Sequence, residues 1–279
     1  MKKTFLISCL LVASFPVMAA YTGHVYVDKN KNGVFDKGEK PMSGVKVSDG
    51  LNVVETAADG SFTLPGHAGE RFIFITTPSG YKTYNRHYHK IEDKQASYDF
   101  GLMPYDGGLG KDGSHKYIHI ADTEIFNTKN HDEWVNNVRD YAANEHAAFI
   151  IHTGDICYEK GLKEHIKLMN TENMDCPVFY CIGNHDLVKG KYGEELFENI
   201  YGPVYYSFDA GRVHYIVTPM AGGDHAPGYT REDVYLWLKN DLAHVKPGTP
   251  IMVFNHDLLT YDDAFVFNPK IRNYHPIHD

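Results

Sequence analysis

The sequence has little cysteine, no excess of positive charge and no apolar run of membrane-spanning length. Four of its 279 residues are cysteine, and one of these, Cys9, lies close to the amino terminus. An odd and sparse set of three in the rest of the chain excludes a disulfide framework of the kind that stabilises small secreted domains. We therefore expect buried free thiols at Cys157, Cys176 and Cys181.

The charge balance also limits the partners. The formal net charge is -9 at pH 7, which argues against broad attraction to nucleic acid or to anionic membrane surfaces. The hydrophobic fraction of 43% and the charged fraction of 23% are ordinary for a folded protein. We find no internal repeat, and a chain of this length divides more naturally into two domains than one. We expect no nucleic-acid partner.

Residues 1–20 are typical of a secretory signal peptide. Two lysines precede an apolar run over residues 5–17, and small residues follow up to Ala20. A membrane anchor needs about 20 apolar residues, and this shorter run contains Pro16. The pattern predicts export to the periplasm or beyond the cell, without a stable membrane span. An uncleaved anchor and lipid attachment at Cys9 are the alternatives.

The pattern of predicted secondary structure changes at about residue 105. Residues 21–104 alternate short β-prone runs with turn residues and show no helical period, which predicts a small all-β sandwich domain. Residues 105–114 are rich in glycine and predict a linker. In residues 115–279, strand-like and helix-like segments alternate, which predicts an α/β domain with a parallel sheet, interrupted by a hairpin over residues 205–217.

A calcium-binding loop is predicted in the first domain. Short oxygen-bearing side chains recur at alternate positions, followed by Gly33 and a more distant glutamate, as in the spacing D-x-[DN]-x-[DN]-G-x5-E. Because strands rather than helices flank the loop, it resembles the calcium loops of exported bacterial β-sandwich modules. The alternative is a solvated polar turn. The predicted calcium ligands are Asp28, Asn30, Asn32, Asp36 and Glu39.

Four polar residues in the second domain each directly follow an apolar, strand-like run. They are Asp122, Asp155, Asn184 and His256. Any one of them would also fit a helix cap or a turn. Together they favour one site, because ligands bind at the carboxyl ends of strands in open α/β sheets. Carboxylate, amide and imidazole ligands suit a pair of divalent ions such as manganese, iron or zinc.

Such a pair has a well-defined chemistry. Two ions about 3.5–4 Å apart can activate a water and stabilise the oxygens of an in-line displacement at phosphorus. One carboxylate must then bridge the two ions.

Three motifs extend this pattern. Gly183-Asn184-His185-Asp186 follows a strand, Gly154-Asp155 ends another, and Asn255-His256 ends a later one. With these motifs the sequence resembles the calcineurin-like metallophosphoesterases over most of residues 115–260. The resemblance implies a four-layer αββα sandwich and hydrolysis of a small phosphoester by a hydroxide that two metal ions activate.

The resemblance also implies roles for individual residues. Asp122, Asp155, Asn184 and His256 would bind the metals, with Asp155 as the bridge. His185 would protonate the leaving alcohol or stabilise the transferring phosphoryl group.

Two features depart from the family. Its first motif is Asp-x-His, whereas Glu124 occupies the histidine position here. Glu124 either ligates, favouring harder ions, or is a surface residue. The closing Gly-His-x-His motif has no match, since His275 and His278 differ in spacing and lack the glycine. We therefore expect an incomplete metal site and a carboxyl-terminally incomplete fold, as in a fragment of a longer precursor. The alternative is a short but functional variant.

Together these features predict an exported, metal-dependent phosphoesterase acting on phosphomonoesters or phosphodiesters. The alternative is a non-catalytic exported binding module, or an inactive fragment, on the same scaffold.

Overall fold

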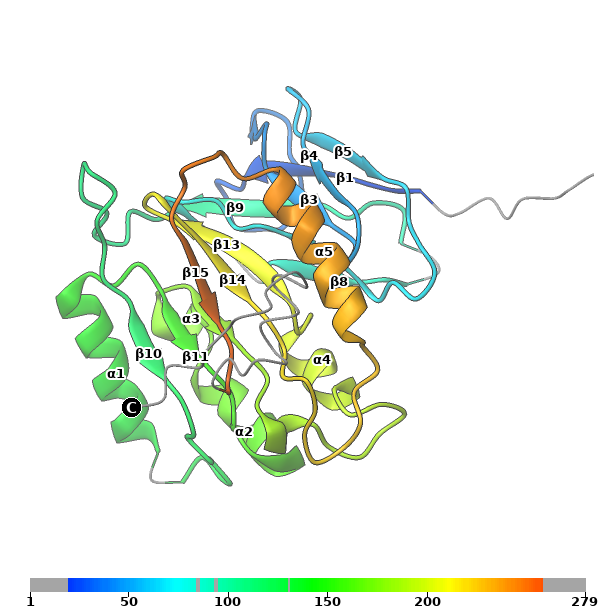
Figure 1. The fold of residues 1–279 in the computed structure, drawn as a ribbon. Helices are drawn as coiled ribbons and strands as arrows, with labels where there is room; N and C mark the ends of the chain where they lie inside the picture. The colour runs from blue at the N-terminus through cyan, green and yellow to red at the C-terminus, as the bar shows by residue number, and fades with distance from the viewer. Residues whose placement is uncertain (1–19, 84–85, 93–94, 130, 258–279) are drawn as a thin grey trace, which may run out of the picture.

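The computed structural model describes residues 20–83, 86–92, 95–129 and 131–257. Most of the predicted signal peptide, and the segment with His275 and His278, lie outside these residues. Figure 1 shows a β-rich amino-terminal region packed against a larger α/β region.

Two β-sheets form the amino-terminal region. The first has the order β2-β1-β9-β7, with β5 paired to β1, and consists of β1 (Tyr21–Val27), β2 (Lys40–Pro41), β5 (Ser61–Leu64), β7 (Tyr81–Thr83) and β9 (Phe100–Pro104). The second has the order β4-β3-β6-β8 and consists of β3 (Lys46–Ser48), β4 (Val53–Glu55), β6 (Phe72–Ile75) and β8 (Tyr88–Lys90). Val25 and Leu102 of the first sheet meet Val47 and Ile75 of the second in one buried core. This is the all-β architecture that the alternating pattern predicts.

Two further sheets form the α/β region. One is parallel, with the order β10-β11-β12, and consists of β10 (Ile118–Ile120), β11 (Ile150–His152) and β12 (Val178–Tyr180). The other consists of β13 (Tyr206–Ala210), β14 (Val213–Val217) and β15 (Ile251–Phe254), with β15 parallel to β14. The β13–β14 pair is the predicted hairpin, and its first strand continues through Ala210.

Helices lie outside both of these sheets. They are α1 (Asp132–Glu145), α2 (Tyr158–Leu168), α3 (Thr171–Met174), α4 (Glu195–Tyr201), α5 (Arg231–Ala243) and the short 3-10 helix η1 (Asn184–Asp186). Ile150 and Val178 of the parallel sheet pack with Val135 of α1. On the opposite face, Phe149 packs between the sheets against Phe208 of β13.

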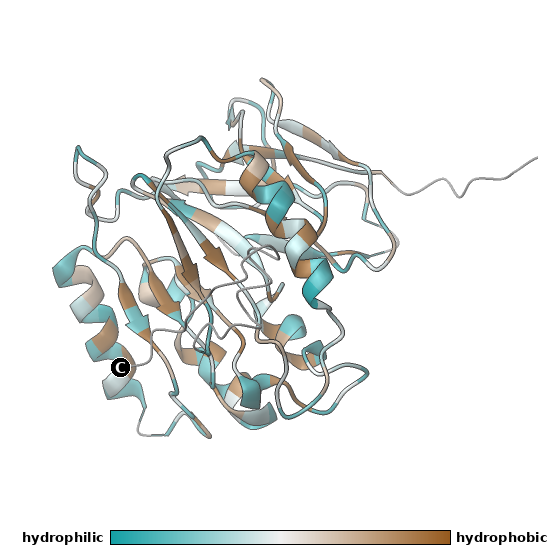
Figure 2. Ribbon diagram, viewed as in Figure 1, coloured by the Kyte–Doolittle hydropathy of each residue, from teal (hydrophilic) through white to brown (hydrophobic). Residues whose placement is uncertain are grey.

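The order of layers is therefore helix, sheet, sheet, helix, with α5 outermost on the second sheet (Figure 1). Asp241 of α5 accepts a hydrogen bond from Ser207 of β13 at 2.8 Å and pairs with His214 of β14 at 2.7 Å. The predicted mixed α/β architecture behind an all-β region is thus confirmed. Figure 2 shows apolar residues along β14 and β15 and hydrophilic stretches along α1.

The cysteines are placed as expected. Cys157, Cys176 and Cys181 are buried and free. Cys176 packs in the core facing the helices, whereas Cys181 packs in the core between the sheets. The two thiols on either side of β12 thus face opposite sides of the sheet.

The predicted linker is in contact with the α/β region. The Tyr105 hydroxyl donates to the carbonyl oxygen of Ala147 at 2.8 Å, and a Cβ on Gly107 would come within 2.7 Å of Ala148 Cα. Arg71 of the sandwich also pairs with Glu194 and Glu198 at the start and in the middle of α4. Phe72 and Phe74 of β6 pack into the buried core of the α/β region. The two regions are therefore held together by polar and apolar contacts, while the exact domain boundaries stay a prediction.

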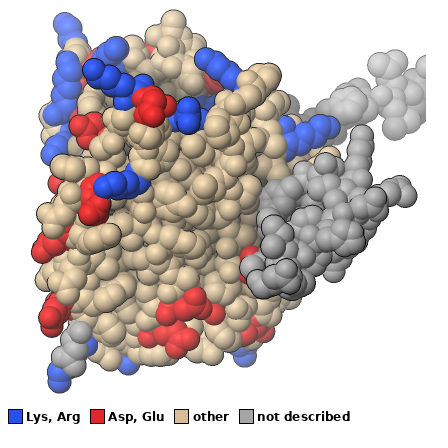
Figure 3. All heavy atoms as spheres, turned by 60° about the vertical axis from the view of Figure 1, so that its left-hand side comes forward, with Lys and Arg blue, Asp and Glu red and all other residues tan. Residues whose placement is uncertain are grey.

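Both positively and negatively charged side chains occur on the face drawn in Figure 3. Basic side chains lie mainly toward the top of that face and acidic ones toward its left and lower edges, with few charges in the middle. Among the residues that the structure describes, no helix combines the length and the apolar character needed to span a membrane.

Candidate metal centre

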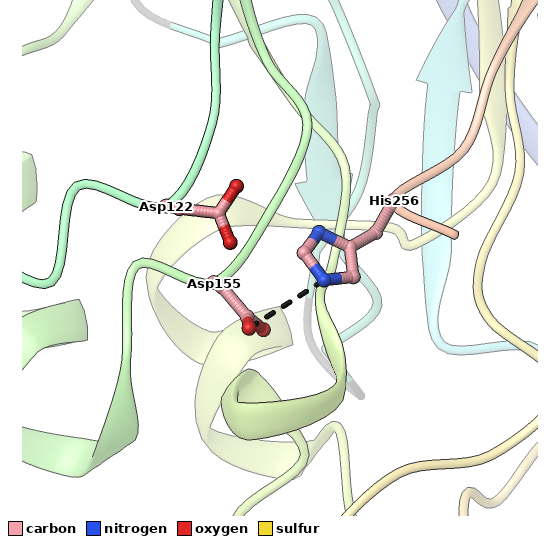
Figure 4. Close-up of side chains that lie close together, drawn as sticks. All are labelled: Asp122, Asp155 and His256. Atoms are coloured by element: carbon pink, nitrogen blue, oxygen red, sulfur yellow. Dashed lines mark ion pairs between the residues drawn. The ribbon is translucent and has the colours of Figure 1, made fainter. Parts of the chain in front are cut away.

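Three predicted metal ligands meet at one end of the two sheets. Asp122 follows β10, Asp155 follows β11 and His256 follows β15. One ligand atom from each lies within 4.8 Å of the others, and Figure 4 shows the three side chains pointing toward one another. His256 Nε2 is 3.5 Å from Asp155 Oδ2. The strand ends thus bring together residues that are up to 134 positions apart in the sequence (256 minus 122).

His256 is oriented by the main chain of a neighbouring strand end. Its Nδ1 lies 2.8 Å from the carbonyl oxygen of Thr153, which can only accept a hydrogen bond. Nδ1 therefore carries the proton, and the lone pair of Nε2 faces Asp155. A ring fixed in this way is a typical feature of metal-binding histidines.

The backbone around the two aspartates is strained. Asp122 and Asp155 have φ values of 54° and 53°, and Glu124 has a φ of 44°. A non-glycine residue in this left-handed region costs on the order of 1 kcal/mol or more, and such strain persists where the surrounding structure imposes it. Here the amide of Asp122 donates to the carbonyl of Gly154 at 3.0 Å. The loops after β10 and β11 thus hold each other in place.

Two glycines allow the loop of Asp155 to touch the turn of Asn184. A Cβ on Gly183 would lie 2.3 Å from Asp155 Oδ1, and one on Gly154 would lie 2.5 Å from the Gly183 nitrogen. Neither position can accept a side chain without displacing the backbone that carries the ligands.

Asp186 ties the same two loops together. Its carboxylate is fully buried and accepts hydrogen bonds from the amides of Cys157 at 2.8 Å and Gly183 at 2.9 Å. Burial raises the pKa of this carboxyl, and the two amides oppose that effect. The sequence motif contains Asp186, but its role as the brace between the loops is visible only in the structure.

A second brace was also missed by the sequence analysis. The buried His152 lies 2.9 Å from the Thr123 hydroxyl through Nε2 and accepts the Gly154 amide through Nδ1. Burial holds the pKa of His152 well below its ordinary value. The neutral ring therefore links the loop after β10 to the end of β11.

Asn184 and Glu124 differ in their relation to this group. Asn184 begins η1, four positions after the last residue of β12. The next amide, that of His185, donates to Asp155 Oδ1 at 3.1 Å. Asn184 is therefore at the same end of the sheet. Glu124 is exposed and is not a member of the three-residue group. It lies near Cys157, whose pKa is raised to about 12 by burial and then by the charge of Glu124.

His185 has a carboxylate partner that the motifs do not contain. Its Nδ1 lies 2.8 Å from Oδ2 of Asp224, which is in the loop between β14 and α5. This hydrogen bond is the main cause that raises the pKa of His185. The sequence offers no spacing signal for Asp224, and its neighbour His225 is exposed.

Two family models match the sequence. The model for calcineurin-like phosphoesterases matches residues 115–275, more than half of the chain, and the model for the N terminal of calcineurin-like phosphoesterases matches residues 29–105. The chain belongs to the calcineurin-like phosphoesterases. No curated protein matches it closely enough to be counted as a relative. Membership supports hydrolysis of small phosphoesters with divalent metals at the level of the superfamily.

This phosphoesterase also contains the predicted calcium loop, between β1 and β2. Asp36 accepts hydrogen bonds from the side-chain amides of Asn30 and Asn32 at 2.8 and 2.7 Å. Asp28 accepts two backbone amides, and Glu39 accepts the amide of Asp36 at 3.1 Å. The five residues share one closed loop, but its three carboxylates do not converge within 4.8 Å as the ligands of the first site do.

A cavity of about 550 Å³ lies away from the metal centre of the phosphoesterase. It is between the two regions, beside Arg86 and His87 of the sandwich and Phe179 and Tyr206 of the α/β region. None of the predicted metal ligands lines it. The strand ends, where charged side chains converge, are therefore a better candidate for the catalytic site than this cavity.

Proposed function

We propose that this chain is an exported hydrolase of phosphomonoesters or phosphodiesters that uses two divalent ions of manganese, iron or zinc. The observation that carries the proposal is the convergence of Asp122, Asp155 and His256, with Nε2 of His256 facing Asp155. Two carboxylates at this distance repel each other, and a divalent cation converts the repulsion into attraction.

The residues have distinct roles in this proposal. Asp122, Asp155, Asn184 and His256 would hold the ions, and Asp155 would serve both of them. Glu124 would be a further ligand only if its side chain turned toward the group. Bound ions supply positive charge for the phosphoryl oxygens and activate the attacking water.

His185 is the acid of the proposed reaction. It lies beside Asp155, to which its amide donates. Nδ1 of His185 is held by Asp224, so that Nε2 is left to donate a proton to the departing alcohol. Asp186 has no contact with substrate in this scheme; it keeps the loops of Asp155 and His185 together.

The experiment is hydrolysis of p-nitrophenyl phosphate and bis-p-nitrophenyl phosphate by the chain with added manganese, together with the metal content of the protein. We expect activity in the wild type, its loss in Asp155→Ala, and only a partial loss in His185→Ala for these two esters, because p-nitrophenolate departs without a proton. Asp155→Ala should also lose metal, whereas His185→Ala should retain it. Asp140→Ala, an exposed carboxylate on α1, is the matched control. A wild type that neither binds manganese nor hydrolyses either ester would overturn the proposal.

A non-catalytic binding module is the second candidate. The observation in its favour is the position of Glu124, which stands where the family has histidine and lies outside the three-residue group. Retention of manganese without hydrolysis of either ester would select this candidate.

Export is part of the proposal and rests on residues 1–20. Expression with the native leader should place the protein outside the cytoplasm, and the mature chain should begin near Tyr21. An intact amino terminus on protein in the cytoplasm would contradict export.

We also propose that the loop of residues 28–39 binds calcium. Calcium should raise the melting temperature of the wild type but not of Asp36→Ala, because Asp36 is the residue on which Asn30 and Asn32 converge. Asp59→Ala, another exposed carboxylate of the sandwich that accepts local hydrogen bonds, is the matched control. Equal melting temperatures of the wild type with calcium and with a chelator would refute a calcium site.

A further inference from the structure

Two exposed aromatic side chains form a stacked pair, and one of them lies beside His185. Phe126 and Tyr158 are 41% and 46% exposed. Their ring centroids are 6.5 Å apart with an interplanar angle of 24°, and the Tyr158 ring is 5.3 Å from the His185 ring. Aromatic rings contribute most to stability when they are buried. A pair of stacked rings left in solvent at the edge of a candidate active site therefore points to a ligand.

Tyr158 is held at this position by a strained backbone. Tyr158 is the first residue of α2 and has a φ of 54°, and the preceding Cys157 has a φ of 74°. Left-handed backbone is a genuine outlier for a bulky residue. The amide of Cys157 is held by Asp186, the residue that braces the metal-binding loops. The same constraint that positions Asp155 therefore places the Tyr158 ring at the edge of the site.

The aromatic pair lies on the side of the leaving group. In the proposed reaction the phosphoryl group is held at Asp122, Asp155 and His256, and His185 donates a proton to the oxygen that departs. Groups attached to that oxygen extend from His185 over its neighbours. Tyr158 is the ring next to His185, and Phe126 stacks beside Tyr158.

The charges around these rings select against anionic leaving groups. The pKa of the Tyr158 phenol is raised by desolvation and then by the carboxylates of Asp224 and Glu124. Neither Asp224 nor Glu124 belongs to the three-residue group whose negative charge bound cations would offset. A second phosphate or a carboxylate on the leaving group would be repelled here. An uncharged ring has no such penalty.

We propose that Phe126 and Tyr158 bind an uncharged, planar aromatic ring in the leaving group of the substrate. The inference rests on the proposed function and narrows it to phosphoesters of alcohols that carry such a ring. Stacking of the substrate on the pair should then favour a planar ring over a saturated ring of the same size, by about 5- to 10-fold in affinity.

The test compares two phosphonates that differ only in the ring. Benzylphosphonate and cyclohexylmethylphosphonate have the same charge and similar size, and neither can be hydrolysed. Their affinities for the manganese-loaded wild type are measured by calorimetry, and we expect benzylphosphonate to bind about 5- to 10-fold more tightly. Phe126→Leu and Tyr158→Leu keep an apolar side chain but remove the planar surface, so each should reduce this preference.

Tyr141→Leu is the matched control, because Tyr141 is an exposed aromatic residue of α1, at 59%, and should leave the preference unchanged. Melting curves show whether the variants are folded. Equal affinity of the wild type for the two phosphonates, or a preference unchanged in Phe126→Leu and Tyr158→Leu, would overturn the inference.

Assays of hydrolysis distinguish failure of the aromatic site from failure of the proposed hydrolase. The esters benzyl phosphate and cyclohexylmethyl phosphate are assayed in parallel. If the phosphonate preference is found and neither ester is hydrolysed, the aromatic site stands and the hydrolase fails. If both esters are hydrolysed at equal rates and the phosphonates bind equally, the hydrolase stands and the aromatic site fails.

Discussion

His185 and Asp224 form a 2.8 Å hydrogen bond across 39 residues of sequence, from the turn after β12 to the loop after β14. The Asp224 carboxylate accepts from Nδ1 and so sets the direction of Nε2. This pairing makes Asp224 a positioning residue for the acid of the proposed reaction, although it is not a member of the three-residue group.

Asp224→Ala should therefore slow hydrolysis most where protonation of the leaving group matters. We expect a loss of about 10- to 100-fold for an alkyl phosphate, below the 10²–10⁴-fold range for losing an acid outright. The loss for p-nitrophenyl phosphate should be much smaller, because p-nitrophenolate departs without a proton. The hydrolysis rates of the wild type and the variant for the two esters test this difference, and the manganese content shows whether the variant keeps its metal. Equal losses for both esters would contradict a positioning role.

Gly183→Ala should disrupt the metal centre without changing any ligand. The new methyl group would lie 2.3 Å from Asp155 Oδ1 and 2.2 Å from the Asp155 nitrogen, and overpacking of this kind costs about 1–3 kcal/mol. We expect a lower melting temperature and weaker manganese binding, both measured on the purified variant. Gly222→Ala is the control, since a Cβ there meets nothing within 4 Å. Unchanged manganese affinity in Gly183→Ala would show that the loops can separate.

Removal of metal should lower the melting temperature of the wild type. Asp122, Asp155 and His256 lie within 4.8 Å of one another, and a cation that binds only the folded state stabilises it by mass action. Addition of a chelator followed by manganese should lower and then restore the melting temperature. His256→Ala should abolish most of this response, whereas His225→Ala, an exposed histidine, should retain it. A full response in His256→Ala would exclude His256 as a ligand.

The stability of the fold should depend on pH through His214. This ring is 1% exposed and lies between Asp209 at 2.6 Å and Asp241 at 2.7 Å. Burial lowers its pKa, but the two carboxylates outweigh burial and raise the pKa above 6.5. The folded state therefore binds a proton more readily than the unfolded chain. The stabilisation from His214 is fully present below pH 6.5 and is lost as the pH rises through the raised pKa.

His214→Gln should remove this dependence. Urea unfolding of the wild type and the variant over a range of pH should show the largest difference in free energy of unfolding in weakly acidic solution and a smaller difference in alkaline solution. His225→Gln should match the wild type throughout. A difference that is the same at every pH would mean that His214 stabilises the fold only by packing.

The order of elements and most of the first site could be predicted from the sequence. Apolar runs followed at once by Asp122, Asp155 and His256 predicted strands with ligands at their carboxyl ends, and the structure places these residues there. Such signals are local, because a strand and the residue that ends it are neighbours in the chain. The calcium loop rests on the same kind of local signal, spacing within 12 residues (28 to 39), and calcium binding there stays a prediction.

The partners of those residues could not be predicted, because they come from segments distant in the sequence. Asp224 reaches His185 only because the loop after β14 folds back on η1, where the Asp224 amide donates to the Asn184 carbonyl at 3.1 Å. The aromatic pair of Phe126 and Tyr158 likewise depends on how the loop after β10 meets the start of α2. Glu124 lies outside the ligand group.

The sequence by itself determined which residues bear chemistry and which family the chain resembles, since both depend on residue identity and local spacing. The tertiary structure alone decided which of these side chains face one another. It did so because strained backbone at Asp122, Asp155 and Tyr158 persists only where neighbouring loops hold it. The Gly154–Gly183 contact and the buried Asp186 that supply this constraint exist only once β11 and β12 have paired in the parallel sheet.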